Sequence, residues 1–213
     1  MVIFEAADTS RERTQAPPDD KILILASKSA ARQAMLKSAG VSFSVQVADV
    51  DEDALKTPGE DASELALDLA HVKALAVSQH HNGAWVLGAD QTLAFSGGLI
   101  SKARSLDEAR TRLQSMRGQT HQLHSAAALA KDGQIVWSGV DTVTMRMRNF
   151  SDSFLDAYLL SEGEGLLSCV GSYRIEGMGS QLFEAVEGDH FTVLGLPLWP
   201  VLAELRRAGV LLT

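Results

Sequence analysis

An aspartate interrupts the apolar run Val86–Leu93, in a stretch that otherwise predicts a buried strand. A carboxylate in that position needs a partner, a bound metal or a raised pKa. The alternative is a turn residue at the end of a strand, but no turn signal follows until Gly97. We therefore expect Asp90 to be functional. Lys102 lies just after the turn that Gly97 predicts, and it could return to the same end of the sheet.

An arginine stands where a helix is expected to begin. If Ser29 is the N-cap, Arg32 occupies the third helical position, where its charge opposes the helix dipole at a cost of about 0.3–1 kcal/mol. An anion between the free N–H groups, the hydroxyls of Ser27 and Ser29, and the cations Lys28 and Arg32 would reverse that sign. The two interpretations are a phosphate site and a solvated surface arginine.

A lysine lies on the apolar side of the helix expected over residues 63–79. At 100° per residue, Lys73 falls within the arc of leucine, valine and alanine side chains. Such a lysine either extends its ammonium group back to water or points it into a cleft at an anion. Both interpretations stay open at this stage.

Helical and strand patterns alternate along the chain, which predicts an α/β fold with a mixed, twisted sheet and flanking helices. We expect strands over residues 22–26, 41–47, 85–95, 119–130, 134–149, 172–176 and 181–186. We expect helices over residues 30–39, 63–79, 105–116, 151–160 and 197–209. No repeat period is visible, so residues 21–213 are expected to form a single domain after a flexible leader over residues 1–20.

The chain has 213 residues, and its 19 Lys+Arg against 27 Asp+Glu give a net charge of −8. This balance argues against nucleic acid polymers and anionic membranes as partners, but not against a small anion bound at a local cationic site. No apolar run approaches the length of a membrane span. Cys169 is the one cysteine, which is typical of a reducing cytoplasm.

Six motifs, in order along residues 22–209, resemble those of the Maf family, the septum-formation-inhibitor homologues, which are nucleoside triphosphate pyrophosphatases. They are Leu25-Ala26-Ser27-x-Ser29-x-x-Arg32, Val50-Asp51-Glu52, Ala70–Ala74, Gly88–Gln91, Gly171–Gly179 and Val193–Leu198. The resemblance implies a two-lobed fold around a central cleft, similar to inosine triphosphatase, and a homodimer. It also implies a divalent metal, Mg²⁺ or Mn²⁺, and cleavage of a nucleoside triphosphate between its α- and β-phosphates.

Residue roles follow from the same resemblance. It implies that Ser27, Arg32, Lys73 and Lys102 hold the triphosphate. Glu52 and Asp90 would serve the metal and the water, and Asp90 matches the proposed general base. Such chemistry needs cations on the phosphates, a metal and a carboxylate that orients or deprotonates water.

The family divides into two branches, and three positions make this chain resemble the 7-methyl-GTP pyrophosphatases. Gln91 follows the motif aspartate, Glu176 precedes Gly177, and Ala31 stands where the dTTP/UTP branch has arginine. The resemblance implies that these three residues contact the substrate. A glutamate can accept hydrogen bonds from the ring N–H and amino group of guanine. The alternatives are another modified purine nucleotide, a dTTP/UTP pyrophosphatase, or a non-catalytic nucleotide-binding regulator of cell division. Ala30 and Ala103 replace the family's usual prolines.

Overall fold

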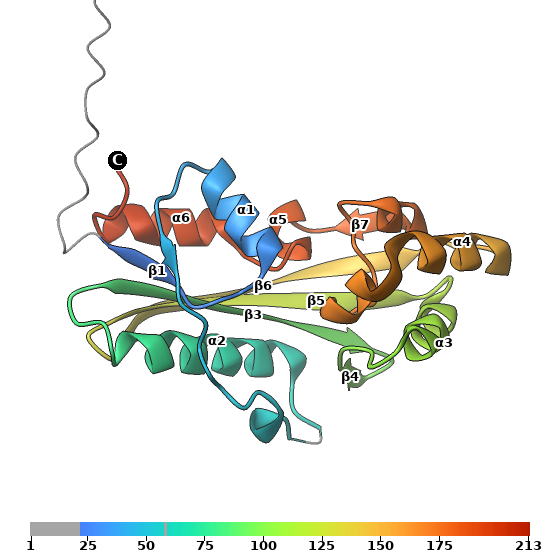
Figure 1. Cartoon of the computed structure of the whole chain (residues 1–213), viewed down its shortest axis with the longest axis horizontal. Helices are drawn as coiled ribbons and strands as arrows, with labels where there is room; N and C mark the ends of the chain where they lie inside the picture. The colour runs from blue at the N-terminus through green and yellow to red at the C-terminus, as the bar shows by residue number, and fades with distance from the viewer. Residues whose placement is uncertain (1–21, 58) are drawn as a thin grey trace, which may run out of the picture.

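A twisted mixed sheet of seven strands forms the centre of the molecule (Figure 1). The computed structural model describes residues 22–57 and 59–213, so the leader expected over residues 1–20 lies outside the described residues. The strands are β1 (Leu23–Leu25), β2 (Ser44–Val45), β3 (Trp85–Phe95), β4 (Gly98–Ile100), β5 (Thr120–Lys131), β6 (Gln134–Met147) and β7 (Phe183–Glu187). Their order is β2-β1-β3-β5-β6-β7, and β4 pairs with β3 outside this path. β1 is parallel to β2 and β3, and every other pairing is antiparallel.

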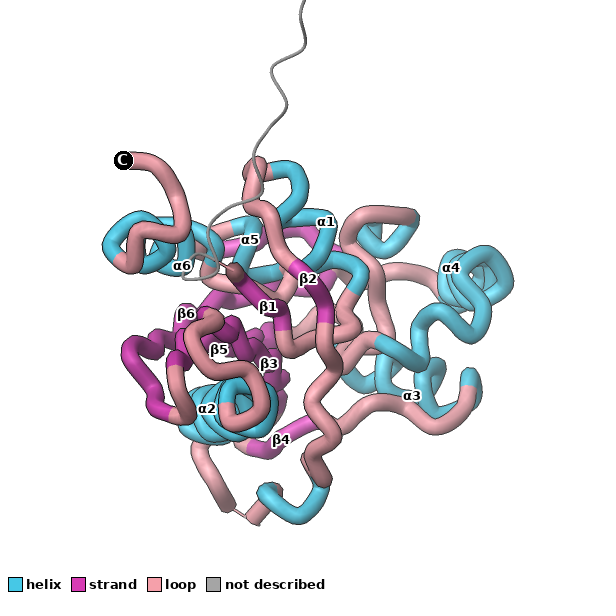
Figure 2. Tube along the Cα trace, turned by 60° about the vertical axis from the view of Figure 1, so that its left-hand side comes forward, coloured by secondary structure: helices cyan, strands magenta, loops and turns pink. Residues whose placement is uncertain are grey.

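Helices cover both faces of the sheet. They are α1 (Ala30–Ser38), α2 (Ala62–Ser78), α3 (Leu106–Met116), α4 (Asp152–Glu162), α5 (His190–Val193) and α6 (Leu198–Arg207), with short 3-10 helices η2 (Asp53–Leu55), η3 (Gly163–Ser168) and η4 (Met178–Leu182). Figures 1 and 2 both show α2 on one side of the sheet and α1, α5 and α6 on the other. α3 and α4 lie at the far end of the sheet (Figure 1).

Two large hydrophobic cores divide the molecule along its length. One core packs α1 and α6 against the sheet and includes the fully buried Leu36 and Leu205. The other packs α3 and α4 against the opposite end and includes the fully buried Leu113 and Tyr158.

The structure confirms the mixed α/β fold and most of its expected elements, among them β3 and the β5–β6 hairpin. The strand expected over residues 41–47 is reduced to β2, an edge strand that pairs only with the short β1. The strand expected over residues 172–176 is wrong. Ser172 has φ 56°, a left-handed conformation that a strand does not contain. No helix within the described ranges combines the length and apolar character needed to cross a membrane.

The helix α2 begins slightly earlier than expected. Asp61 caps it, and its Oδ1 accepts hydrogen bonds from the N–H groups of Ser63 at 2.8 Å and Glu64 at 3.2 Å. At the other end, Ser78 is buried, and its Oγ accepts a hydrogen bond from the Gly133 N–H at 3.0 Å. The α2 helix is thus capped at its start and joined at its end to the turn between β5 and β6.

Candidate functional site

Lys73 joins the two carboxylates that the motifs single out. Its Nζ lies 2.5 Å from Asp90 Oδ1 and 2.7 Å from Glu52 Oε1. The side chains of Lys73 and Asp90 are only 11% and 13% exposed, and that of Glu52 is 43% exposed. The structure therefore supports the interpretation in which the ammonium group of Lys73 faces an anionic group rather than water.

The sheet topology leaves Asp90 open to this cluster. The pairing of β1 with β3 ends at Leu87, so the following residues of β3 extend beyond the end of that parallel neighbour. Asp90 also lies on the same face of β3 as Gly88, because side chains alternate along a strand. A Cβ atom at Gly88 would lie 2.2 Å from the Ala70 carbonyl oxygen. The missing side chain thus lets α2 approach closely enough for Lys73 to reach Asp90.

Arg32 is buried, so the interpretation as a solvated surface arginine is wrong. Its Nε donates to the Gly195 carbonyl at 2.7 Å, and its Nη1 donates to Ser27 Oγ at 3.1 Å and to the Ala89 carbonyl at 3.0 Å. Burial lowers the pKa of Arg32, whereas the charges of Asp90 and Glu52 act in the opposite direction. A cation is therefore fixed at the start of α1, close to both carboxylates. Ser29 caps this helix as expected.

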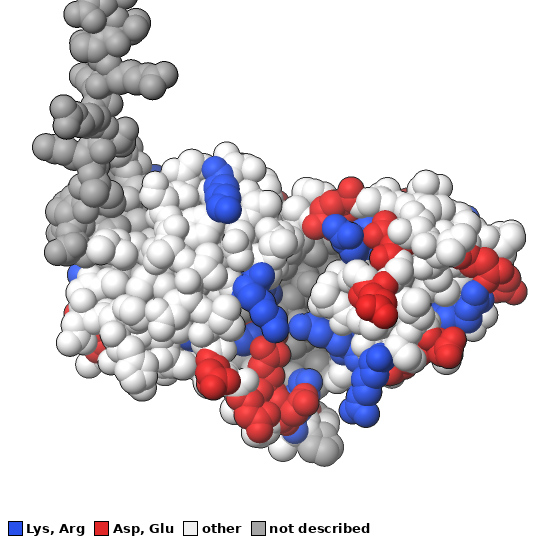
Figure 3. All heavy atoms as spheres, in the orientation of Figure 1, with Lys and Arg blue, Asp and Glu red and all other residues white. Residues whose placement is uncertain are grey.

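Lys102 is exposed and forms no ion pair with the residues that the structure describes. The pKa of Glu52 lies below its ordinary value. Burial acts to raise it, but the hydrogen bond to Lys73 and the positive charges of Lys73, Lys102 and Lys56 outweigh that effect. Lys102 thus contributes to the potential around Glu52 without a direct bond. Figure 3 shows acidic and basic side chains gathered around a recess in the middle of one face, over the loop that contains η2.

The donor set of this cluster fits a metal held jointly with substrate. Within residues 22–57 and 59–213, no group of three or more His, Cys, Asp or Glu side chains is arranged to hold a metal ion. Glu52 and Asp90 each bond Lys73 through one oxygen, which leaves the second oxygen of each carboxylate for another ligand. Mg²⁺ is commonly bound by one or two carboxylates plus substrate phosphates.

Gln91 lies on the opposite face of β3 from Asp90. Its Nε2 approaches three acceptors, namely Ser125 Oγ at 3.0 Å and the carbonyl oxygens of Thr192 at 3.0 Å and Val193 at 3.1 Å. These contacts hold α5 and the start of the following loop against the sheet. In this structure Gln91 therefore positions the backbone near Gly195, which is the partner of Arg32.

A cavity of about 530 Å³ brings together Ala31 and Glu176, two residues expected to bind the substrate. It lies between α1, the α5 region and the start of α6, and its lining includes the aromatic rings of Phe191 and Trp199. Sequence reasoning missed this aromatic pair. Trp199 follows the Leu196-Pro197-Leu198 turn into a helix, and nothing in the local pattern distinguishes it from a core residue.

Buried hydrogen bonds hold the segment that carries Glu176. Tyr158 Oη accepts from the Arg174 N–H at 3.1 Å, and Glu162 Oε1 accepts from the Met178 N–H at 3.2 Å. His121 Nε2 and Tyr173 Oη lie 2.7 Å apart. Burial lowers the pKa of His121 to about 4. The segment is therefore fixed on both sides of the exposed Glu176.

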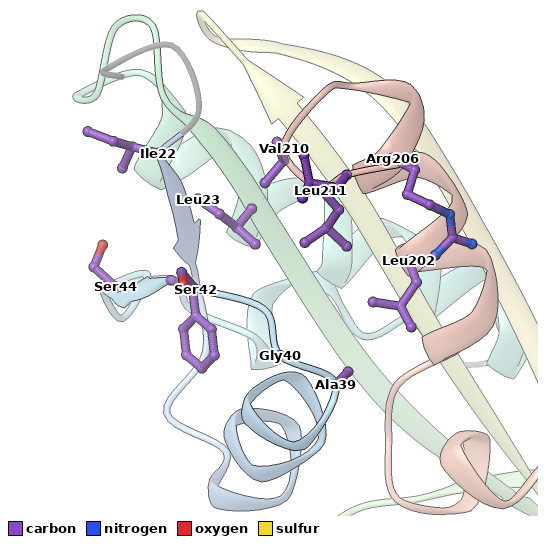
Figure 4. Close-up of a pocket in the computed structure, with 12 residues that line it drawn as sticks. Ile22, Leu23, Ala39, Gly40, Ser42, Ser44, Leu202, Arg206, Val210 and Leu211 are labelled. Carbon is purple, nitrogen blue, oxygen red and sulfur yellow. The ribbon is translucent and has the colours of Figure 1, made fainter. Parts of the chain in front are cut away.

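A larger cavity of about 720 Å³ lies elsewhere, between the β1–β2 edge of the sheet and α6 (Figure 4). Its lining includes Ile22, Phe43, Leu202 and Arg206. It contains none of the residues that the sequence singles out. The chemistry-bearing residues gather instead around the Lys73 cluster and the smaller cavity.

Known proteins are similar to this chain in sequence over most of its length. The family model described as Maf-like protein matches residues 22–208. A 7-methyl-GTP pyrophosphatase from Brucella suis biovar 1 (strain 1330) is 47% identical over 189 residues, covering 87% of this chain and 95% of that protein. A nucleoside triphosphate pyrophosphatase from Caulobacter vibrioides is 50% identical over 191 residues, covering 88% and 96%. A HAM1 protein structure from Coxiella burnetii superposes with a TM-score of 0.38 at 14% identity, covering 61% of this chain and 74% of that one.

Proposed function

The chain belongs to the Maf family, and on that premise we propose that it hydrolyses a nucleoside triphosphate to the nucleoside monophosphate and pyrophosphate. The observation that carries the proposal is the Lys73 ammonium group held between Asp90 and Glu52, beside the buried Arg32. Two cations and two carboxylates in one recess provide what phosphoanhydride hydrolysis needs.

Each member of the cluster has a distinct task in this proposal. Arg32, Lys73 and the exposed Lys102 bind the phosphate oxygens, with Ser27 beside Arg32. Water attacks the α-phosphorus while Asp90 takes its proton. The bond between the α-phosphorus and the bridging oxygen breaks, and pyrophosphate leaves. Phosphates that compete for Lys73 would release the Asp90 oxygen that Lys73 occupies in this structure.

We also propose that Glu52 and Asp90 hold a divalent cation, Mg²⁺ or Mn²⁺. Their second carboxylate oxygens support this assignment, because two carboxylates plus substrate phosphates form a common Mg²⁺ ligand set. When bound, the ion would neutralise charge on the triphosphate. Removal by EDTA and restoration with Mg²⁺ or Mn²⁺ test this.

The substrate that we propose is 7-methyl-GTP. The name of the Brucella suis relative, a 7-methyl-GTP pyrophosphatase, supports this choice, and so does the cavity shared by Ala31 and Glu176. A carboxylate can accept hydrogen bonds from the guanine ring N–H and amino group, which pyrimidines do not offer in that arrangement.

Pyrophosphate release from 7-methyl-GTP, GTP, dTTP and UTP tests both the reaction and the preferred nucleobase of the substrate. We expect 7-methyl-GTP to give the highest kcat/KM. Equal turnover of dTTP and UTP would contradict the assignment of a methylated guanine as the nucleobase. Asp90→Asn should abolish release yet retain triphosphate binding. Wild-type protein that binds nucleotide without turnover would instead fit a non-catalytic regulator.

A homodimer and a cytoplasmic location belong to the same proposal. The family resemblance supports the homodimer, and the single free Cys169 is compatible with a reducing compartment. Light scattering after size-exclusion chromatography would measure the oligomeric state. Fractionation of cells that express the tagged chain would measure its location.

A further inference from the structure

We propose that Trp199 is a stacking platform for a positively charged, N7-alkylated purine base. This inference rests on the proposed function and assigns the base-binding part of the same site. Trp199 lies in the first turn of α6 and lines the cavity that contains Glu176 and Ala31. None of the motif residues explains why an indole should stand there.

The indole is held in place although most of it is exposed. Trp199 is 62% exposed, but its Nε1 donates to Asp189 Oδ1 at 3.2 Å. Its ring meets that of Phe191 edge-on, with centroids 5.4 Å apart and an interplanar angle of 81°. Asp189 is itself fixed, because its Oδ2 accepts from the Thr192 N–H at 3.1 Å. A large aromatic surface that is oriented and left open is suited to stacking.

The charges along the cavity favour a cationic base over a neutral one. Its described lining contains the Glu176 carboxylate and the His190 imidazole, but no lysine or arginine. Alkylation at N7 places a delocalised positive charge on the purine, and such a cation is attracted both to the face of an indole and to a nearby carboxylate. The same groups would add less to the binding of unmodified guanine.

The cavity adjoins the cluster that would bind the phosphates. Its lining includes Ala31 and Leu194, which precede Arg32 and Gly195 in the chain. Arg32 Nε donates to the Gly195 carbonyl at 2.7 Å, so these two parts of the lining lie next to the cluster. One ligand could therefore place its phosphates near Arg32 and its base beside Trp199. The cations would hold the polyanionic end, while the carboxylate and the indole would hold the cationic end.

Steady-state kinetics of Trp199→Ala measure the contribution of the indole. We expect the KM for 7-methyl-GTP to rise about 3- to 30-fold, the range of a cation–π contact, with kcat changed less than about twofold. The KM for GTP should rise less. Trp199→Phe should restore most of the affinity, because phenylalanine retains an aromatic face. Equal KM increases for both nucleotides would overturn the charge argument.

Tryptophan fluorescence tests the same contact without turnover. Titration with 7-methyl-GMP should quench wild-type emission more strongly than GMP does, and Trp199→Phe should remove most of that quenching. Trp137→Phe is the matched control, because Trp137 lies on β6 outside the cavity lining and should leave the quenching intact. Melting temperatures of the variants would reveal any loss of folding.

The two measurements separate this inference from the proposed function. If wild-type protein hydrolyses no triphosphate but 7-methyl-GMP quenches Trp199, the proposed function fails and the stacking assignment stands. If 7-methyl-GTP is hydrolysed but neither its KM nor the quenching depends on Trp199, the stacking assignment is wrong and the hydrolysis stands.

Discussion

Gly88 sets the distance between α2 and the central strand, so Gly88→Ala should disturb the site without altering any charged group. The added Cβ would lie 2.2 Å from the Ala70 carbonyl oxygen, 2.6 Å from the Ala74 nitrogen and 2.9 Å from the Ala74 Cβ. Two of these atoms belong to the backbone, so a side-chain rotation cannot relieve the overlap. The helix must move by about 1 Å to restore normal contact distances.

That displacement has two measurable consequences. Overpacking of this kind costs about 1–3 kcal/mol, which for a chain of this size lowers the Tm by roughly 3–10 °C. It also withdraws Lys73 from Asp90, which it contacts at 2.5 Å, and a misplacement of about 1 Å can lower kcat by up to roughly 100-fold. We expect at least a tenfold loss of kcat for pyrophosphate release, measured well below the Tm.

Gly98→Ala is the matched control. Gly98 begins β4 in the adjoining hairpin, its φ is not in the left-handed region, and an added Cβ would meet only the Phe95 carbonyl oxygen at 3.9 Å. We expect the stability of this variant to lie within about 0.5 kcal/mol of wild type, with unchanged kcat. If Gly88→Ala were as stable and as active as Gly98→Ala, the close approach of α2 would not be what positions Lys73.

Three further predictions concern the cluster and its supports. His121 has its pKa lowered to about 4 by burial, so its contribution to stability is complete above about pH 6.5 and is lost as the pH falls towards 4. Denaturant unfolding should therefore give about 2 kcal/mol less stability at pH 5 than at pH 8 from this group, a difference that His121→Gln should reduce. Lys73→Met should lower kcat/KM about 100-fold and the unfolding free energy by about 1–3 kcal/mol, because Lys73 bridges two carboxylates. Lys102→Met, which breaks no such bridge, should raise the KM with less than about 0.5 kcal/mol of destabilisation. Equal losses of stability in the two variants would contradict this. Tyr158→Phe removes the acceptor of the Arg174 N–H and should raise the KM for 7-methyl-GTP more than it lowers kcat, and an unchanged KM would show that this bond does not position Glu176.

Three of the residues that sequence reasoning singled out share one property, which is that each breaks a local rule. Asp90 stands in an apolar strand, Lys73 on an apolar helix face and Arg32 at the wrong end of a helix dipole. A polar group in such a place needs a partner, so local patterns alone can identify it. The structure places all three close together, and Lys73 and Asp90 form an ion pair.

Local patterns could not reveal the groups that complete the site. Arg32 donates to Gly195, which is 163 residues away along the chain, and only the fold brings them together. Gly88 is an ordinary small residue until α2 lies against it. Trp199 matches a core pattern, and its exposure depends on where α5 and α6 meet. Each depends on tertiary packing rather than on spacing.

The charges of the central cluster balance within the protein itself. Arg32 and Lys73 carry two positive charges, and Asp90 and Glu52 carry two negative ones. A triphosphate that enters without a cation therefore meets a cluster with no net charge, to which the exposed Lys102 adds attraction. Metal-free binding of 7-methyl-GTP should consequently be weak, since the two carboxylates offset the attraction of the two cations for the phosphates.

Glu52→Gln should separate the charge of the cluster from its ability to hold metal. The substitution leaves one net positive charge beside the recess, so 7-methyl-GTP should bind more tightly in EDTA, by about 3- to 10-fold for a partly exposed charge. It also removes a carboxylate that we assign to the metal, so the Mg²⁺ concentration needed for half-maximal turnover should rise. Isothermal titration calorimetry in EDTA measures nucleotide binding, which should become tighter. Mg²⁺-dependent kinetics measure metal binding, which should become weaker. A purely structural loss would weaken the binding of both nucleotide and metal. A variant that bound nucleotide more weakly in EDTA would therefore refute the charge-balance argument.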